Sequence, residues 1–269
     1  MEKVDLSDVS ELITESEIID FERDGHVCIR GLSTPEEIGN FKPSLEETAA
    51  NGVYEKKPLQ DRDTYGKAFL QVHNLWQRNE TCKKFVFAKR FAHAAARLLR
   101  ASSVRLYHDQ ALLKEPGGGH TPWHQDQTYW PLEKGSTLTM WLPLSNISKE
   151  IGSMHFVSGS HGLGDINAGV ISDESHHEIQ KWIDDQEQSV TTYGAMRVGD
   201  ATFHSGFTIH SAPANPSNMP RPVMTVIYVA EGTRILEPTP EQKFDLKFWL
   251  DGRLPGETVG GPLNPILYP

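Results

Sequence analysis

The alternating apolar pattern in the second half of the chain limits the possible folds most. Short apolar runs recur between residues 104 and 229, most clearly at every second position of 137–144, and Gly- or Pro-rich turns separate them. Successive side chains of a strand point to opposite faces, so this spacing predicts short strands with one apolar face. Long helical segments do not alternate with these strands. The pattern therefore predicts an all-β sandwich or jelly roll rather than a parallel α/β sheet.

We expect strands at 27–29, 104–114, 137–144, 154–157, 201–203, 208–210 and 223–229. The first hundred residues are otherwise predicted to be helical. Thr14 and Glu17 form a capping box that opens a helix through Phe21, and Pro35 begins a second helix. Helical spacing of apolar residues predicts one helix over 83–99.

An acidic helix that contains histidines is expected at 172–188, as an insert between strands. The 269 residues are interpreted as a single domain. Its expected parts are a helical N-terminal part at about 1–102, a jelly-roll core at about 103–232 and a C-terminal tail at about 233–269.

Composition argues against several classes of partner. The 36 acidic residues outnumber the 26 basic ones, the formal net charge is −10, and no Lys/Arg run stands out. We therefore expect neither nucleic acid nor a membrane as a partner. No apolar run approaches the roughly 18 residues of a membrane span, and the acidic N-terminal segment lacks the apolar run of a signal peptide. The expectation is a cytoplasmic monomer or homodimer whose partner is a small-molecule substrate.

The segment HTPWHQDQTYWP holds the best candidate for a metal site. His120 and His124 would share one face of a helix, whereas His124 and Asp126 would share one face of a strand. The predicted β setting favours the second pair. Two histidines and one carboxylate on one side of a metal are typical of non-haem Fe(II) oxygenases. The third ligand must come from elsewhere, and His204 and His210 both lie in apolar, strand-like sequence.

Other readings of these residues remain open at this point. A lone H-x-D pair is weak evidence, and a near-match at His176, His177 and Glu178 is interpreted as solvated helix surface. Arg221 lies eleven residues after His210 (221 − 210), directly before an apolar strand. Its guanidinium could hold the far carboxylate of a dicarboxylate co-substrate bidentately, or it could be a surface arginine between two prolines.

Several motifs together resemble the phytanoyl-CoA dioxygenase (PhyH-like) family. His124 of the PWHQD motif is followed by His210 after 86 residues (210 − 124) and then by Arg221. The segments WLPLSNISKEIGSMHFVSGSH, GDATFHSG and FDLKFWLDGRLPGE also look like family sequence. The resemblance covers most of the chain after about residue 65. It implies a mainly β protein with flanking helices and a double-stranded β-helix core, which is a cupin-like jelly roll. It also implies an Fe(II)/2-oxoglutarate-dependent oxygenase that uses O₂.

The resemblance carries site residues over to this chain one by one. His124, Asp126 and His210 would be the iron ligands, and Arg221 would bind 2-oxoglutarate. His204 fits a packed histidine beside the ligands better than a ligand. Four further residues are expected at the 2-oxoglutarate pocket: Trp141, Thr139, Gln110 and Ser211.

The chain departs from the family pattern at one position. Many members have a serine two residues after the distal histidine, where this chain has Ala212. Ser211 or Thr139 could replace the hydrogen bond that is lost. Gln71 and Lys114 are further candidates for reaching the pocket.

The resemblance implies an enzyme that oxidises a small molecule, with a secondary metabolite suggested as substrate, and releases succinate and CO₂. Relatives that halogenate have Gly or Ala in place of Asp126, so its presence favours an oxidation that begins with hydrogen abstraction. Hydroxylation, cyclisation, epimerisation and desaturation are all compatible outcomes. The alternatives are a jelly-roll metal-binding module without oxygenase turnover, and a metal-dependent isomerase or hydrolase that needs no O₂. The loop around Tyr129 is expected to form a wall of the substrate pocket.

Overall fold

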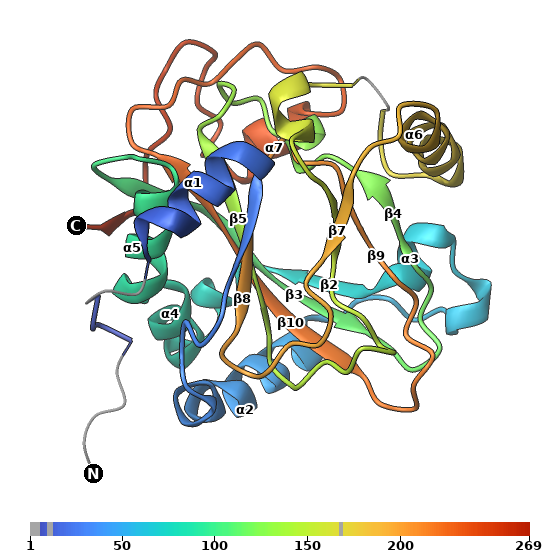
Figure 1. Cartoon of the computed structure of the whole chain (residues 1–269). Coiled ribbons are helices and arrows are strands. Elements are labelled where there is room, and N and C mark those ends of the chain that lie inside the picture. The colour runs from blue at the N-terminus through green and yellow to red at the C-terminus, as the bar shows by residue number, and fades with distance from the viewer. Residues whose placement is uncertain (1–5, 10–12, 167–168) are drawn as a thin grey trace.

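The chain forms two antiparallel sheets that curl into a half-barrel with flanking helices (Figure 1). The computed structural model describes residues 6–9, 13–166 and 169–269. The larger sheet has the strand order β1-β8-β5-β10-β3-β11, with β2 also paired to β3, and the smaller sheet has the order β4-β9-β6-β7. The predicted mainly β class is therefore confirmed. Within the described residues, no helix is long and apolar enough to cross a membrane.

The larger sheet consists of β1 (His26–Ile29), β2 (Leu70–His73), β3 (Val104–Lys114), β5 (Thr137–Pro143), β8 (Ala201–Ser205), β10 (Arg221–Ala230) and β11 (Ile266–Tyr268). The smaller sheet consists of β4 (Thr121–His124), β6 (His155–Val157), β7 (Val190–Thr192) and β9 (His210–Ala212). Each predicted strand is present, with ends that differ by at most two residues. Strands β2, β7 and β11 were not predicted, and β4 was expected only as the strand that carries His124 and Asp126.

The α-helices are α1 (Glu15–Asp24), α2 (Pro35–Gly52), α3 (Thr64–Ala68), α4 (Glu80–Val86), α5 (Lys89–Leu98), α6 (Asp173–Asp185) and α7 (Lys243–Phe248). The described residues also form short 3-10 helices, namely η1 (Leu59–Asp61), η2 (Leu75–Gln77), η3 (Asp126–Tyr129) and η4 (Ser160–Leu163). The capping box of Thr14 and Glu17 is present at α1, and Ser172 caps the predicted acidic helix α6.

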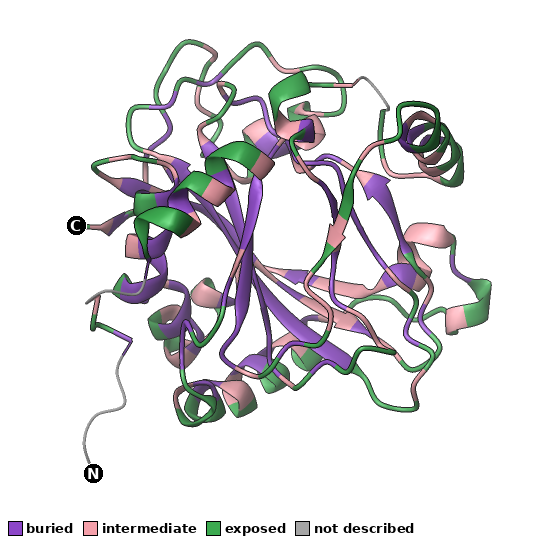
Figure 2. Ribbon diagram, viewed as in Figure 1, coloured by how far each residue is buried: buried purple, intermediate pink, exposed green. Residues whose placement is uncertain are grey.

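The outer face of the larger sheet packs against the N-terminal helices. Leu138, Met140 and Leu142 of β5 are buried in one apolar cluster with Phe85 of α4 and Phe91 of α5. Figure 1 shows α1, α4 and α5 on this side of the sheet, and Figure 2 shows that its strands are mostly buried. Burial of these side chains is the main source of stability for this half of the molecule.

The prediction of one helix over 83–99 is wrong, because the segment forms α4 and α5 with a break between them. Ala88 has an extended conformation (φ −60°, ψ 120°) and caps the start of α5. The break directs the second helix so that the Phe91 ring contacts the Phe85 ring edge to face, with centroids 5.3 Å apart. Neither Gly nor Pro marks this point in the sequence, so tertiary packing overrides helix propensity here.

The predicted N-terminal and C-terminal parts both contribute strands to the larger sheet. Strand β1 pairs with β8, β2 pairs with β3, and β11 pairs with the start of β3. The sheet therefore extends beyond the segment 103–232 that was expected to hold the jelly-roll core.

A β-bulge in β3 decides which of its residues reach the inner side of the larger sheet. Tyr228 of β10 pairs with Leu106 of β3, and the adjacent Ile227 pairs with His108. Tyr107 is therefore the extra residue and has no partner in β10. An extra residue in one strand reverses the alternation of its side chains. Leu106 and Tyr228 therefore pack in the outer core, whereas His108 and every second residue after it line an inner cavity.

Gly199 fixes the turn before β8 to the segment after β1. The backbone N–H of Ser33 donates to the carbonyl of Gly199 at 3.0 Å. At Gly199 φ is +99°, and a β-carbon there would lie 1.9 Å from the Ser33 carbonyl oxygen. A side chain would therefore meet both backbone strain and a clash.

We predict that Gly199→Ala lowers the free energy of unfolding by about 2–5 kcal/mol, since left-handed strain costs about 1–2 kcal/mol and overpacking adds about 1–3 kcal/mol. Gly194→Ala is the matched control, because Gly194 also has positive φ (+65°) but nothing lies within 4 Å of the added carbon. It should lose only the strain, about 1–2 kcal/mol. Urea unfolding of the two variants measures the difference, and equal losses would contradict this account.

Candidate active site

Three side chains converge at the paired ends of β4 and β9. His124 is the last residue of β4 and stands opposite His210, the first residue of β9, with ring centroids 4.1 Å apart. Asp126 begins η3 two residues after His124. One possible ligand atom from each of the three side chains lies within 4.8 Å of the other two. This is the geometry of a site that can hold one metal ion.

His124 and Asp126 project to the same side of the backbone, as expected, although they do not belong to one strand. The sequence pattern placed both on one strand, but β4 ends at His124. Gln125 between them is extended (φ −118°, ψ 129°), so the alternation continues for one residue beyond the strand. The Gln125 side chain points the other way and donates to the carbonyls of Gly164 and Phe207.

Hydrogen bonds fix both imidazole rings so that one nitrogen of each could bind a metal. Nδ1 of His124 lies 2.8 Å from the carbonyl oxygen of Pro122, and Nδ1 of His210 lies 2.9 Å from that of Thr208. Because a carbonyl only accepts, Nδ1 carries the proton and Nε2 keeps its lone pair. Burial, with the neighbouring His124 and His204, holds the pKa of His210 well below its usual value. The donor set therefore fits a cation such as iron.

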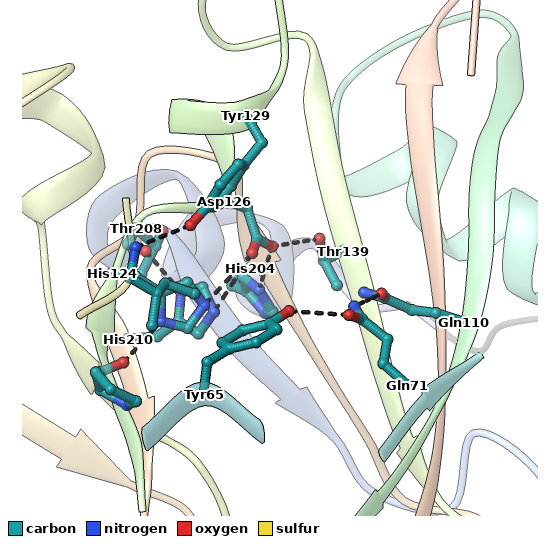
Figure 3. A network of polar contacts seen from close by, with 12 residues as sticks. Tyr65, Gln71, Gln110, His124, Asp126, Tyr129, Thr139, His204, Thr208 and His210 are labelled. Atoms are coloured by element: carbon teal, nitrogen blue, oxygen red, sulfur yellow. Dashed lines mark hydrogen bonds and ion pairs between the residues drawn. The ribbon is translucent and has the colours of Figure 1, made fainter. Parts of the chain in front are cut away.

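The Asp126 carboxylate is held by the larger sheet through one of its oxygens (Figure 3). Oδ2 accepts from the Thr139 hydroxyl at 2.9 Å and lies 3.2 Å from Nε2 of His204. Oδ1 lies 3.6 Å from Nε2 of His124 and 3.7 Å from Nε2 of His210. Burial alone would raise the pKa of Asp126, but the adjacent histidines hold it well below its usual value. The carboxylate is thus charged, with Oδ1 available to a metal.

The other histidines of the sequence analysis lie outside the trio. His204 is only 1% exposed and contacts the carboxylate, so it supports Asp126. His120 lines a neighbouring cavity together with His176, and their ring centroids are 4.7 Å apart. His176 is not simply solvated, as had been expected, because its Nδ1 accepts a hydrogen bond from the Trp123 backbone N–H.

The register of the larger sheet puts the other predicted pocket residues on its inner face. Thr139 stands opposite His204, Trp141 opposite Thr225, and Thr225 opposite Gln110. Register partners in an antiparallel sheet project to the same side. All five line the cavity that contains the three converging side chains, as do Ser211, Ala212, Gln71 and Lys114.

One part of this cavity is strongly positive. Arg221 and Lys114 are register partners, are 5% and 1% exposed, and form no ion pair with any described carboxylate. Burial lowers the pKa of Arg221 to about 10, and burial with the charge of Arg221 lowers that of Lys114 to about 7. Nη1 of Arg221 donates to the Gly152 carbonyl at 3.1 Å, while its Nε has no partner among the described residues. The guanidinium lies 5.6 Å from the ring centroid of Trp141. Two buried basic side chains without a carboxylate partner can together hold an anion.

The rest of the cavity is lined by residues that the sequence analysis did not assign. They come from three regions far apart in the chain: Tyr65, Phe69 and His73 before β3, His108 in β3, and Phe244, Asp245 and Trp249 in the C-terminal tail. Tyr129, expected as a wall, also lines it. Figure 3 shows Tyr65 hydrogen-bonded to Gln71, which in turn contacts Gln110. The family-like segment that begins FDLKFWLDG was the one sequence signal in the tail, but the sequence analysis assigned no pocket role to its residues.

The profile of the Phytanoyl-CoA dioxygenase (PhyH) family matches residues 21–223. The chain therefore belongs to this family.

Relatives and solved structures agree with this assignment. The chain is 28% identical over 131 residues to a protein of Stutzerimonas stutzeri named "Probable alpha-ketoglutarate-dependent hypophosphite dioxygenase", and the match covers 48% of this chain and 46% of that one. The chain thus spans about half the length of that relative. The crystal structure of the non-heme alpha ketoglutarate dependent carbocyclase SnoK from nogalamycin biosynthesis superposes with a TM-score of 0.77 at 25% identity, over 96% of this chain and 98% of that one.

A second similar structure is that of the epimerase SnoN in complex with Fe3+, alpha ketoglutarate and nogalamycin RO. It has a TM-score of 0.75 at 25% identity and covers 94% of this chain and 98% of that one. These findings confirm the predicted family and fold. The relative and both solved structures are named as alpha-ketoglutarate-dependent enzymes.

We predict that Thr139→Val lowers metal affinity by about tenfold, because hydrogen bonds that orient a ligand are worth roughly 10–100-fold in affinity. Thr202→Val is the control, since Thr202 is a buried neighbour on β8 whose hydroxyl has no hydrogen-bond partner among the described residues. Competition for Co(II) or Zn(II) against a chromophoric chelator measures both. The same affinity in the two variants would show that Thr139 does not orient Asp126.

Proposed function

We propose that this protein is an Fe(II)/2-oxoglutarate-dependent oxygenase whose iron ligands are His124, Asp126 and His210. The convergence of their three donor atoms, beside a pair of buried cations in the same cavity, is the observation that carries the proposal. Imidazole and carboxylate ligands suit iron, and three ligands on one side leave positions for a co-substrate and O₂. The bound metal would supply the redox chemistry that activates O₂.

The positive part of the cavity would bind 2-oxoglutarate. The Arg221 fork matches the far carboxylate of the co-substrate, and Lys114 adds a second charge beside it. Trp141 packs against the guanidinium, and Gln110 lines the wall. Ser211 is the better replacement for the family serine, because the Thr139 hydroxyl already donates to Asp126.

The rest of the cavity would hold the substrate and exclude water from it. Its aromatic walls suit a small organic molecule, and a secondary metabolite is the class we favour, because SnoK and SnoN come from nogalamycin biosynthesis. The reaction would begin with hydrogen abstraction from a substrate carbon and end in hydroxylation, cyclisation or epimerisation, with succinate and CO₂ released. We expect the protein to act in the cytoplasm as a monomer or homodimer.

Two measurements test this function without knowledge of the substrate. Under argon, addition of 2-oxoglutarate to the Fe(II)-loaded protein should produce a metal-to-ligand charge-transfer band in visible absorption. In air, the same mixture should convert 2-oxoglutarate to succinate, even if slowly. A protein that retains iron but gives neither the band nor succinate would rule out the proposal.

His124→Ala should abolish both the band and succinate formation, because it removes one of the three iron ligands. His120→Ala is the matched control, since His120 lies four residues earlier and lines the neighbouring cavity. We expect this variant to keep both signals within about twofold of the wild type, as is usual for substitutions away from a site. Equal loss in the two variants would point to a general structural effect.

The affinity for 2-oxoglutarate should fall as pH rises above about 7. Lys114 has a lowered pKa of about 7, so above this pH the free protein must take up a proton to present two cations to the dicarboxylate. Linkage then weakens binding by up to about tenfold per pH unit. At pH 6.5 the Lys114→Met variant should bind 2-oxoglutarate more weakly than the wild type, and its affinity should change little up to pH 8.5. The control variant Lys149→Met, at an exposed lysine, should show the affinity and pH dependence of the wild type. Isothermal titration of the anaerobic Fe(II) protein measures this; a flat profile in the wild type would exclude Lys114.

A further inference from the structure

A buried carboxylate lines the cavity outside the metal-ligand trio. Asp245 belongs to α7 and is 7% exposed, and its neighbours Phe244 and Trp249 line the same cavity. Asp126 is the carboxylate of the proposed metal site, and neither that site nor the proposed co-substrate site needs Asp245 as a second carboxylate in the cavity. Its presence in a partly aromatic chamber therefore needs a separate explanation.

Asp245 has a neutral hydrogen-bond donor but no cation. The Tyr107 hydroxyl donates to its Oδ2 at 3.1 Å. No Lys or Arg among the described residues forms an ion pair with it. Burial accordingly raises the pKa of Asp245 to about 7. A buried carboxylate without a counter-charge is costly, and a bound cation would remove that cost.

The two histidines on this side of the cavity do not supply the missing charge. The rings of His73 and His108 both lie 5.0 Å from the Trp249 ring, measured between centroids. Burial lowers the pKa of His73 to about 4 and that of His108 to about 3, so both are neutral near pH 7. The bond from Tyr107 anchors α7 to β3, but it does not balance the charge of the carboxylate.

Aromatic side chains next to Asp245 continue to the molecular surface. Phe244 is 55% exposed and Phe248 is 46% exposed, and their rings stack with centroids 4.3 Å apart. Phe244 also contacts Trp249 edge to face, at 6.0 Å. Because Phe244 both lines the cavity and reaches solvent, it lies at the cavity mouth. Aromatic faces of this kind attract organic cations and pack against rings.

We propose that Asp245 binds a protonated amine of the substrate, and that Phe244 and Trp249 pack against the adjoining carbon skeleton. The substrate class is thus an organic amine with a ring or another broad apolar part. This inference rests on the proposed function, because it takes the occupant of the cavity to be the substrate of the oxygenase. The net charge of −10 also favours the approach of a cationic molecule. Asp245 acts as a specificity residue and takes no part in the oxidation.

A matched pair of probes tests the proposal. The probes are 1-naphthylmethylamine and 1-naphthalenemethanol. They share the same ring system, but the first carries an ammonium group where the second carries a hydroxyl group. Calorimetric titrations use the full-length protein saturated with Fe(II) and 2-oxoglutarate under argon, and are repeated with metal-free protein. We expect the wild type to bind the amine at least about tenfold more tightly than the alcohol, as a charge-assisted hydrogen bond in a buried site implies.

Asp245→Asn keeps an acceptor for Tyr107 but removes the charge. It should lose about tenfold or more in affinity for the amine and less than about twofold for the alcohol. Glu241→Gln is the control, because Glu241 is an exposed carboxylate four residues earlier that does not line the cavity. It should leave both affinities unchanged. Phe244→Ala should weaken the binding of both probes, and it should leave folding intact because Phe244 is exposed.

The proposal is overturned if the wild type binds the two probes equally, or if Asp245→Asn keeps the affinity for the amine. Thermal melting reports whether Asp245→Asn folds, and the wild-type comparison decides the question even if it does not. The metal-free titrations separate this inference from the oxygenase activity. Amine selectivity without a charge-transfer band or succinate would contradict only the proposed function, and the reverse result would contradict only the role of Asp245.

Discussion

The pairing of β4 with β9 is the contact on which the rest of the site depends. It sets His124 opposite His210 on the smaller sheet, while Asp126 is held by Thr139 and His204 of the larger sheet. The carboxylate therefore joins the two sheets at the point where the candidate ligand atoms converge. Since each imidazole is fixed by a carbonyl of its own chain segment, a shift of one sheet against the other would move Asp126 relative to both rings.

The cavity around this point carries charges of opposite sign in different parts. Arg221 and Lys114 on neighbouring strands form a positive part, whereas Asp245 brings a carboxylate from the C-terminal tail. The positive part would attract a dicarboxylate co-substrate and repel an amine substrate. The Asp245 carboxylate would attract the amine and repel the dicarboxylate. Burial strengthens both effects, because charges in a site with little water are poorly screened. The charge pattern thus provides a physical means of sorting two ligands within one cavity.

Local patterns in the sequence predicted the strands and the residues that converge. Period-two alternation located β5, and short apolar runs located β3 and β10. The H-x-D spacing gave His124 and Asp126, and the family resemblance added His210, which is now found beside them. The break between α4 and α5 was missed because no Gly or Pro marks it and packing of Phe85 against Phe91 sets the turn. The bulge at Tyr107 was missed for a similar reason, since it is defined only by the register with β10.

The sequence by itself determined the fold class, the family resemblance and the candidate ligands, because these depend on spacing along the chain. Only the tertiary structure decided which side chains meet in the cavity. His204 supports Asp126, Lys114 lies beside Arg221, and Asp245 enters from a tail more than a hundred residues away from Tyr107. These contacts depend on strand register, on a bulge and on the path of the C-terminal segment. None of the three leaves a periodic signal in the sequence, because each results from pairing between distant segments.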